Sequence, residues 1–466
     1  MTLKQFFAPS DMTTGRPWEK ILVFTVPMLL GNIAQQLYNT VDSIVVGRYV
    51  GDNALAAVGS ASPIYNLLLV LFMGVSVGAS VMVSQYFGAR KREELSKTIG
   101  NSITLTAIVS LIIMVMGLLL VKPLLRLLST PASIIDWCAD YLLILSLGIA
   151  GTAYYNILCG ILRGLGDSIS ALIYLLIAAA VNTVLDIWFV AGLHMGVAGA
   201  ALATIIAQAL SAVLCILKLR KMQNLFDLRT HYLKIDKFHT RTIIKLGLPS
   251  GITQAIFSMA MIVVQSLTNS FGEMVIAANV IIMRVDGFAM MPNFSFGTAM
   301  TTYAGQNVGA NQYERVSQGA KQGTLIAVLT STIITGIILI FGRFLMGIFT
   351  QTSELVTLSN NMMRIIAVGY IAMAVTQCLS GVMRGAGDTM TPMWISLITT
   401  VVIRVPIAYG LVWITRSPEL PQGAYQSLWI SMLISWLMGA LITFICYRRG
   451  KWKTKGLGTS KPITLE

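Results

Sequence analysis

Two acidic side chains lie inside long apolar stretches of the sequence, where a charge is costly. Asp42 follows Gln35 and Tyr38 in PMLLGNIAQQLYNTVDSIVVG, at intervals of three and four residues that place all three on one helix face. Asp186 follows Asn182 by four residues in AAAVNTVLDIWFV, again on one face. Carboxylate, amide and hydroxyl oxygens can ligate Na⁺, and a carboxyl in an apolar setting can instead hold a proton. This pattern predicts a site that binds and releases a cation.

Two further polar residues, Asn156 and Thr204, fall within apolar stretches and can add oxygen ligands to such a site. A sodium ion would then be held chiefly by Asp42, Asn182 and Asp186. The alternative is that both acids lie near the ends of their helices, reach interfacial water and satisfy one another. Asn and Thr are weaker indicators because they commonly form hydrogen bonds between packed membrane helices.

The second half of the chain has a different polarity. The positions that correspond to Asn182 and Asp186 are Ile403 and Ile407, next to the cationic Arg404. Arg284 and Asp286 are two residues apart and therefore lie on different helix faces. Arg284 either projects into a substrate cavity or pairs with a neighbouring helix, and the pattern leaves both open.

Methionine and phenylalanine are frequent between residues 257 and 300. Met259 and Met283 are the two that we expect to line a substrate cavity, because pliable thioethers suit varied apolar compounds. Packing within the protein or contact with lipid explains the same enrichment equally well.

The elements that must position these residues follow from composition. Of the 466 residues, 55% are apolar and only 11% are charged, which excludes a soluble enzyme. The five cysteines and three histidines show no metal-ligand spacing, which excludes a disulfide scaffold and a zinc module. A helix crosses a membrane in about 20 apolar residues. We find twelve such stretches: 20–47, 54–84, 97–121, 134–160, 170–192, 197–218, 242–268, 278–305, 320–345, 357–380, 392–415 and 426–447.

The cations of the chain indicate its orientation. Most of the 33 Lys and Arg residues fall in segments on the same side as the N-terminus, which predicts that this side is cytoplasmic. An even number of spans places the C-terminus there as well. The basic excess is thus a topology signal and requires no nucleic-acid partner. The polar start of the chain lacks the features of a cleavable signal sequence.

The two halves of the chain repeat one another. LCGILRGLGD (158–167) recurs as LSGVMRGAGD (379–388), and nearly the same offset pairs Gln85 with Gln306 and Pro27 with Pro249. We therefore expect an all-α integral membrane protein whose twelve transmembrane helices form two pseudo-twofold-related six-helix lobes. The expected domains are an N-lobe at 1–218, a cytoplasmic linker at 219–241, a C-lobe at 242–447 and a basic cytoplasmic tail at 448–466.

Parallel repeats of this kind are typical of transporters with a site near the bilayer midplane, although a duplicated scaffold without transport would show them too. Pro27 lies inside the first stretch, where a proline removes a backbone hydrogen bond and kinks the helix. We expect protonation of Asp42 or its neighbours to bend this helix at Pro27.

The sequence resembles the multidrug and toxic compound extrusion (MATE) transporters over essentially its whole length. The start WEKILVFTVPMLLGNIAQQLYNTVDSIVVGRYVG, the repeated RGxGD and the segments around Gln85 and Gln306 carry the resemblance. It implies two lobes around a central cavity and cation-driven antiport that expels organic, often cationic, compounds. It also implies a coupling site in the N-lobe, with the bend at Pro27 beside it. The residues that fit this site are Asp42, Asn156, Asn182, Asp186 and Thr204, with Gln35 and Tyr38 nearby.

Residues 242–268 and 357–380 have no central carboxylate, which the resemblance links to the DinF-like branch and to coupling by protons. We therefore expect an antiporter in a bacterial plasma membrane, working as a monomer without a cofactor and exporting small organic cations in exchange for H⁺ or Na⁺. The alternative within this superfamily is a flippase for lipids or lipid-linked sugars, which would need a cationic cavity. An enzyme is disfavoured, because no span contains a histidine and no nucleophile–base set is present.

Overall fold

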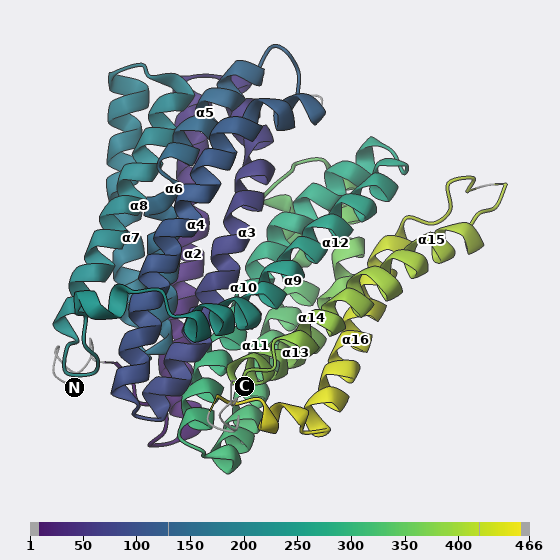
Figure 1. The fold of residues 1–466 in the computed structure, drawn as a ribbon. Helices are drawn as coiled ribbons and strands as arrows, with labels where there is room; N and C mark the ends of the chain where they lie inside the picture. Colours follow the sequence, from purple (N-terminus) through teal and green to yellow (C-terminus); the bar gives the residue numbers. More distant parts are fainter. Residues whose placement is uncertain (1–8, 129, 419, 458–466) are drawn as a thin grey trace. The chain divides into compact units, whose positions relative to one another are not determined.

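The computed structural model describes residues 9–128, 130–418 and 420–457, and every regular element among them is a helix (Figure 1). The first half contains α2 (Pro17–Tyr49), α3 (Asp52–Gly88), α4 (Arg92–Leu127), α5 (Ile135–Leu147), α6 (Ile149–Gly164), α7 (Ser168–Asp186), η1 (Ile187–Gly192) and α8 (Gly196–Lys221). The remainder contains η2 (Thr230–Leu233), α9 (Lys237–Asn269), α10 (Glu273–Gly309), α11 (Tyr313–Gly347), α12 (Ser353–Ala367), α13 (Gly369–Gly385), α14 (Met390–Leu397), η3 (Ile398–Ile403), α15 (Arg404–Ile414), α16 (Gln426–Arg448) and η4 (Lys451–Thr454).

The helices confirm the expected membrane fold. Within the described residues, ten helices are long and apolar enough to cross a membrane, and two bent pairs raise the number to twelve if each pair is one span. The bent pairs are α5 with α6, at 54°, and α12 with α13, at 44°. Several helices are longer than the apolar stretches expected from the sequence, and α4, for example, begins at Arg92. The boundaries expected from hydropathy are too short because the helix ends carry charged residues, which lower the local hydropathy.

The chain forms two compact units. The first contains Val26–Gly251 together with the segment that ends at Asp11, and the second contains Met12–Thr25 and the chain from Ile252 onward. The chain therefore passes from one unit to the other within α2 and within α9.

The segment between α8 and α9 packs against α4. The Arg92 guanidinium forms an ion pair with Asp227, with Nη2 and Oδ1 3.0 Å apart, and also donates to the carbonyl oxygen of Gln223. Asn101 Oδ1 accepts from the backbone N–H of Asp236, 2.9 Å away. The most hydrophilic stretch of the sequence is therefore an ordered part of the first unit.

The repeated RGxGD motif forms the same turn in both units. Asp167 and Asp388 each donate a backbone hydrogen bond to the carbonyl oxygen five residues earlier, and the glycine before each has a positive φ, 86° at Gly166 and 95° at Gly387. A Cβ at Gly166 would lie 2.2 Å from the Ser10 carbonyl oxygen, so only glycine fits. Each aspartate then accepts hydrogen bonds from the first turn of the next helix. The sequence repeat is thus a repeat of helix-capping structure.

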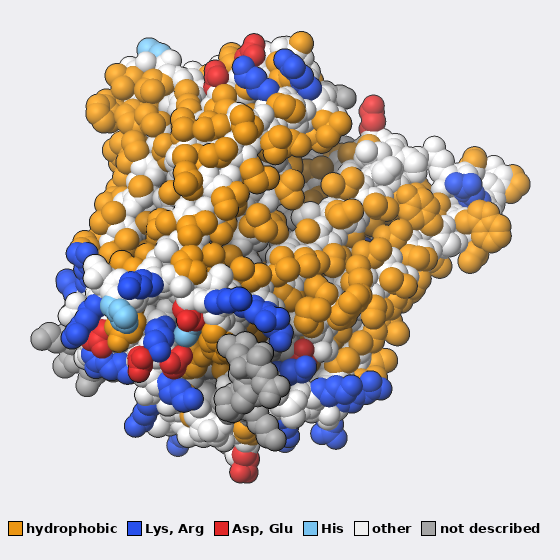
Figure 2. All heavy atoms as spheres, in the orientation of Figure 1, with side chains coloured by type: hydrophobic (Ala, Val, Ile, Leu, Met, Phe, Trp, Pro, Cys, Tyr) orange, Lys and Arg blue, Asp and Glu red, His pale blue; other side chains and the backbone are white. Residues whose placement is uncertain are grey.

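Apolar side chains cover the outward faces of the long helices, as Figure 2 shows. On the first unit, Leu111, Leu119 and Ile112 of α4 are more than half exposed. Lys and Arg gather at the end of the unit where the segment between α8 and α9 lies (Figure 2). An apolar band next to a basic end is the surface of a protein that spans a lipid bilayer.

Candidate functional site

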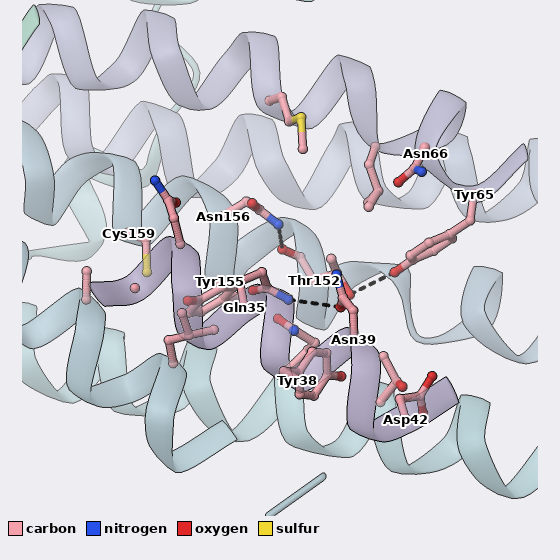
Figure 3. A pocket seen from close by; sticks show the side chains of 18 of the residues that line it. Gln35, Tyr38, Asn39, Asp42, Tyr65, Asn66, Thr152, Tyr155, Asn156 and Cys159 are labelled. Carbon is pink, nitrogen blue, oxygen red and sulfur yellow. Dashed lines mark hydrogen bonds between the residues drawn. The ribbon is translucent and has the colours of Figure 1, made fainter. Parts of the chain in front are cut away.

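The first unit encloses a cavity of about 600 Å³ between α2, α3, α5, α6, α7 and α8. Figure 3 shows the side chains that reach into it from α2, α3 and α6. Much of its lining is polar although the surrounding helices are apolar. The polar and charged lining residues are Asn32, Gln35, Tyr38, Asn39, Asp42, Ser43, Ser62, Tyr65, Asn66, Tyr141, Thr152, Tyr155, Asn156, Arg163, Ser168, Thr204 and Gln208.

One face of α2 supplies the predicted polar series. Gln35, Tyr38 and Asp42 all line the cavity, as their helical spacing predicts, and Pro27 lines it closer to the start of the helix. Gln35 Nε2 donates to Asn39 Oδ1 at 3.3 Å. The Tyr38 and Asp42 side chains are buried in this wall. A helix that is otherwise apolar thus presents one polar stripe to the cavity.

Another wall is built by α6 and α3. Asn156 Nδ2 donates to the Thr152 carbonyl oxygen at 2.8 Å, and the Thr152 hydroxyl lies 3.1 Å from the Tyr65 hydroxyl (Figure 3). Ser76 of α3 donates to the Asn156 carbonyl oxygen at 2.8 Å. These bonds fix the orientation of Tyr65 and Asn156 toward the cavity.

The two carboxyl groups predicted to act together are neighbours. Asp42 interacts with Asp186, which ends α7 and is fully buried. Asn182, one turn earlier, is also fully buried and donates to the Thr204 hydroxyl at 3.5 Å. Asp42 and Thr204 line the cavity, whereas Asn182 and Asp186 are not among its lining residues.

These acceptors lack donors within the protein. Among the described residues, no hydrogen-bond donor satisfies either carboxylate oxygen of Asp186, Oδ1 of Asp42 or Oδ1 of Asn182. A buried carboxylate without a donor is costly unless a proton or a cation compensates it. The π-helical turn η1, which begins directly after Asp186, is a feature often found at functional sites. The arrangement suits the binding of a small cation.

A resident metal centre of the usual kind is not formed by the described residues, which contain no group of three His, Cys, Asp or Glu side chains that could hold a metal ion. Two carboxyl groups with amide and hydroxyl oxygens form a hard-donor set instead. Such a set fits a proton or Na⁺, an ion that can be exchanged as part of transport.

The assignment of Met259, Met283 and Arg284 to a substrate cavity stays a prediction. Met259, Met283 and Arg284 belong to the second unit, are exposed, and line neither the cavity of the first unit nor the smaller one of the second. Asn279 Nδ2 lies 3.7 Å from the Met283 sulfur. A methionine-rich composition cannot distinguish cavity walls from other exposed helix faces.

The structure adds cavity residues that the sequence pattern did not single out. Tyr65, Thr152 and Tyr155 come from helices whose apolar residues outnumber their polar ones, so no local spacing marked them. Arg163 belongs to the repeated RGxGD motif and also lines the cavity. A polar side chain inside an apolar span is the sequence signal that could have identified such residues, and Tyr65, within the stretch 54–84, is an example.

The MatE family model matches residues 27–188 and 249–410, which together make up more than half of the chain. This chain belongs to the MatE family. The two matched segments correspond to the two halves of the internal repeat, and the resemblance noted from the sequence is confirmed at the level of the family. MatE proteins are membrane transporters, and this chain is a multi-pass membrane protein of that family.

Related proteins cover the chain almost from end to end. The probable multidrug resistance protein YoeA of Bacillus subtilis is 28% identical, over 94% of this chain and 95% of that protein. The probable multidrug resistance protein YpnP of the same organism is 29% identical, over 97% and 99%. A crystal structure of a MATE protein in a bent conformation superimposes with a TM-score of 0.88 at 24% identity, covering 97% of this chain and 98% of that one. The structural match confirms the expected MATE fold.

Proposed function

We propose that this chain is a secondary antiporter that exports organic, mostly cationic compounds across a bacterial plasma membrane in exchange for protons. The observation that carries the proposal is the buried pair of Asp42 and Asp186, of whose oxygens three are buried without a donor among the described residues, with Asp42 on the wall of a cavity of about 600 Å³. Relatives named as probable multidrug resistance proteins support the transport of drugs. The proposed antiporter is a monomer and needs no cofactor.

The cavity has the properties that an organic cation requires. Its volume lies within the range of ligand sites, about 300–1,000 Å³. Tyrosine rings at positions 38, 65, 141 and 155 can stack on a flat compound or face a positive charge. Asp42 is the single acid among the described residues of the lining and can pair with the charge of a bound compound.

The exchange follows from competition for Asp42. A proton on the carboxyl pair removes the negative charge that attracts an organic cation, so protonation weakens substrate binding. By reciprocity, bound substrate weakens proton binding by the same factor. Asn182 and Thr204 supply an amide and a hydroxyl group beside the pair, Asn156 adds an amide on the α6 wall of the same cavity, and Na⁺ is the alternative ion that such oxygens can hold.

Pro27 gives α2 a place to bend. It lies on the cavity wall about four helical turns before Asp42, on the same helix. We infer that a change of charge at Asp42 alters the bend of α2 at this proline and thereby the shape of the cavity.

Efflux from cells tests the proposal. In a host that lacks its own pumps, Asp42→Asn and Asp186→Asn should abolish the efflux of a fluorescent organic cation. Each variant replaces a carboxyl group of the pair with an amide, which cannot take up and release a proton during transport. Asp136→Asn is the matched control, since Asp136 is an exposed acid at the start of α5 in the same unit and does not line the cavity. Membrane levels and gel filtration in detergent verify folding. Efflux by Asp42→Asn at the rate of the unsubstituted protein would refute the proposal.

A further inference from the structure

The second unit has a cavity of its own, with the opposite charge. It measures about 60 Å³ and lies between α9, α13, α14, η3, α15 and α16. Among the described residues, the charged ones in its lining are Arg384 and Arg404, and none in the lining is acidic. This volume has room for a small ion or a few water molecules and is too small for a drug-sized compound.

Neither guanidinium is neutralised by a partner. The Arg384 side chain forms no ion pair or hydrogen bond with any described residue. Arg404 Nε is buried without an acceptor in the described part of the chain, and one Nη lies 3.4 Å from the Met432 sulfur, a weak acceptor. A guanidinium has five N–H donors, and leaving them unmet away from water is costly.

The acid that acts electrostatically on Arg404 does not supply the missing hydrogen-bond acceptors. Asp286 influences Arg404 electrostatically but forms no ion pair with it among the described contacts. Its Oδ1 instead accepts a hydrogen bond from the Tyr370 hydroxyl, 2.8 Å away. Asp286 also does not line the cavity, so it partly offsets the charge of Arg404 from a distance without filling the site.

Neutral donors complete the lining. The side chains of Gln377, Ser380, Ser396 and Thr400 line the cavity and form no hydrogen bond with a described residue. By contrast, the neighbouring Thr399 hydroxyl donates to the Ile395 carbonyl oxygen at 2.8 Å. Thr399 and Thr400 lie in the π-helical turn η3, a kind of turn that is frequent at functional sites.

A surplus of donors with two positive charges is the chemistry of an anion site. The planar fork of arginine matches the oxygens of phosphate and carboxylate groups. Two separate forks and several neutral donors exceed what the two oxygens of a carboxylate can accept, and they suit the tetrahedral oxygens of a phosphate. We propose that the cavity between Arg384 and Arg404 binds a phosphate group, from inorganic phosphate or from the headgroup of a lipid. This site is independent of the proposed exchange at Asp42.

Titration of the purified full chain with inorganic phosphate, in phosphate-free detergent buffer, tests the site. We expect saturable binding to the unsubstituted protein, with acetate and chloride binding at least tenfold more weakly. Arg384→Gln and Arg404→Gln should each weaken phosphate binding at least tenfold. Arg364→Gln is the matched control, because Arg364 is exposed on α12 and lines neither cavity.

Two more variants separate a binding role from a structural one. Arg404→Lys keeps the charge and should retain more of the phosphate affinity than Arg404→Gln does. Asp286→Asn removes the negative charge that acts on Arg404 and should tighten phosphate binding. If Arg404 served only to balance Asp286, then Asp286→Asn would leave phosphate binding unchanged, and the proposal would be overturned for that arginine.

The source of the phosphate is distinguished in nanodiscs of phosphatidylcholine with and without phosphatidic acid. A rise in melting temperature with phosphatidic acid that both arginine-to-glutamine variants lose identifies a lipid headgroup. Phosphate binding in detergent without that rise identifies the free anion. Absence of binding in both arms, or binding that neither variant weakens, would overturn the proposal.

Discussion

Replacing Asp167 should destabilise the protein more than the same replacement of its repeat partner Asp388. Both residues follow the positive-φ glycine of the RGxGD turn and accept hydrogen bonds from the next helix. Asp167 accepts from the backbone N–H of Ser170 at 2.9 Å, and Asp388 accepts from that of Thr391 at 3.3 Å. Asp167 also forms an ion pair, with its Oδ2 3.2 Å from Lys218 Nζ, whereas Asp388 forms none with any residue in the described part of the chain.

The magnitude follows from these contacts. Loss of the cap costs about 1 kcal/mol at either aspartate. Breaking a buried ion pair costs about 3–5 kcal/mol, because the remaining charge is stranded. The Asp167 side chain is 1% exposed, but Lys218 is 15% exposed and can reach water with its flexible stem, so we discount the ion-pair part to about 2 kcal/mol. The expected losses are about 3 kcal/mol for Asp167→Ala and about 1 kcal/mol for Asp388→Ala.

Unfolding by sodium dodecyl sulfate in mixed micelles, followed by circular dichroism, measures these free energies. Asp167→Asn and Asp388→Asn are the most informative pair, since asparagine retains an acceptor for the cap and removes only the charge. Asp167→Asn should lose about 2 kcal/mol, the ion-pair part of the loss after discount for the partly exposed lysine. Asp388→Asn should change little.

A second substitution verifies the cause. Lys218→Met in the Asp167→Asn background removes the stranded charge and should recover part of the lost stability. Equal losses for Asp167→Asn and Asp388→Asn, or no recovery with Lys218→Met, would refute the reasoning.

Two further predictions concern α2 and the start of α9. Pro27→Ala restores a backbone donor inside α2, so we expect a straighter helix and reduced efflux of a fluorescent organic cation at unchanged protein level; unchanged efflux would contradict the proposed bend. The backbone N–H of His239 donates to Asp236 at 2.8 Å and holds the pKa of that carboxyl below its usual value. This stabilisation is present above the pKa of the unfolded chain and is lost as the pH falls through the lower folded-state pKa. Asp236→Asn should therefore flatten the acid limb of the stability–pH curve, and an unchanged limb would contradict this account.

Much of the fold was predictable because membrane helices are marked by local properties. Length and apolar composition predicted the twelve spans, and the offset between LCGILRGLGD and LSGVMRGAGD predicted the repeat. Hydropathy did not predict the bend between α5 and α6 or the π-helical turns, because packing between helices determines them.

The candidate site was predictable where one helix carried the pattern. Intervals of three and four residues placed Gln35, Tyr38 and Asp42 on one face, and the structure places all three on the cavity wall. The proximity of Asp186 to Asp42 was inferred only because both are acidic residues within apolar spans, since no local spacing links residues on α2 and α7. The same limit explains why the sequence did not predict that Arg384 and Arg404, from different helices, line one cavity.

The central claim is that export of an organic cation is driven by exchange for protons at Asp42. Purified protein in liposomes preloaded with a fluorescent organic cation, with H⁺ and Na⁺ gradients imposed separately, tests it most directly. We predict that outward movement of the compound accelerates when protons are more concentrated outside, that a Na⁺ gradient alone has no effect, and that Asp42→Asn abolishes the acceleration. Acceleration by a Na⁺ gradient alone would contradict coupling to protons and identify Na⁺ as the coupling ion. Movement of the compound that depends on neither gradient would contradict cation-coupled exchange altogether.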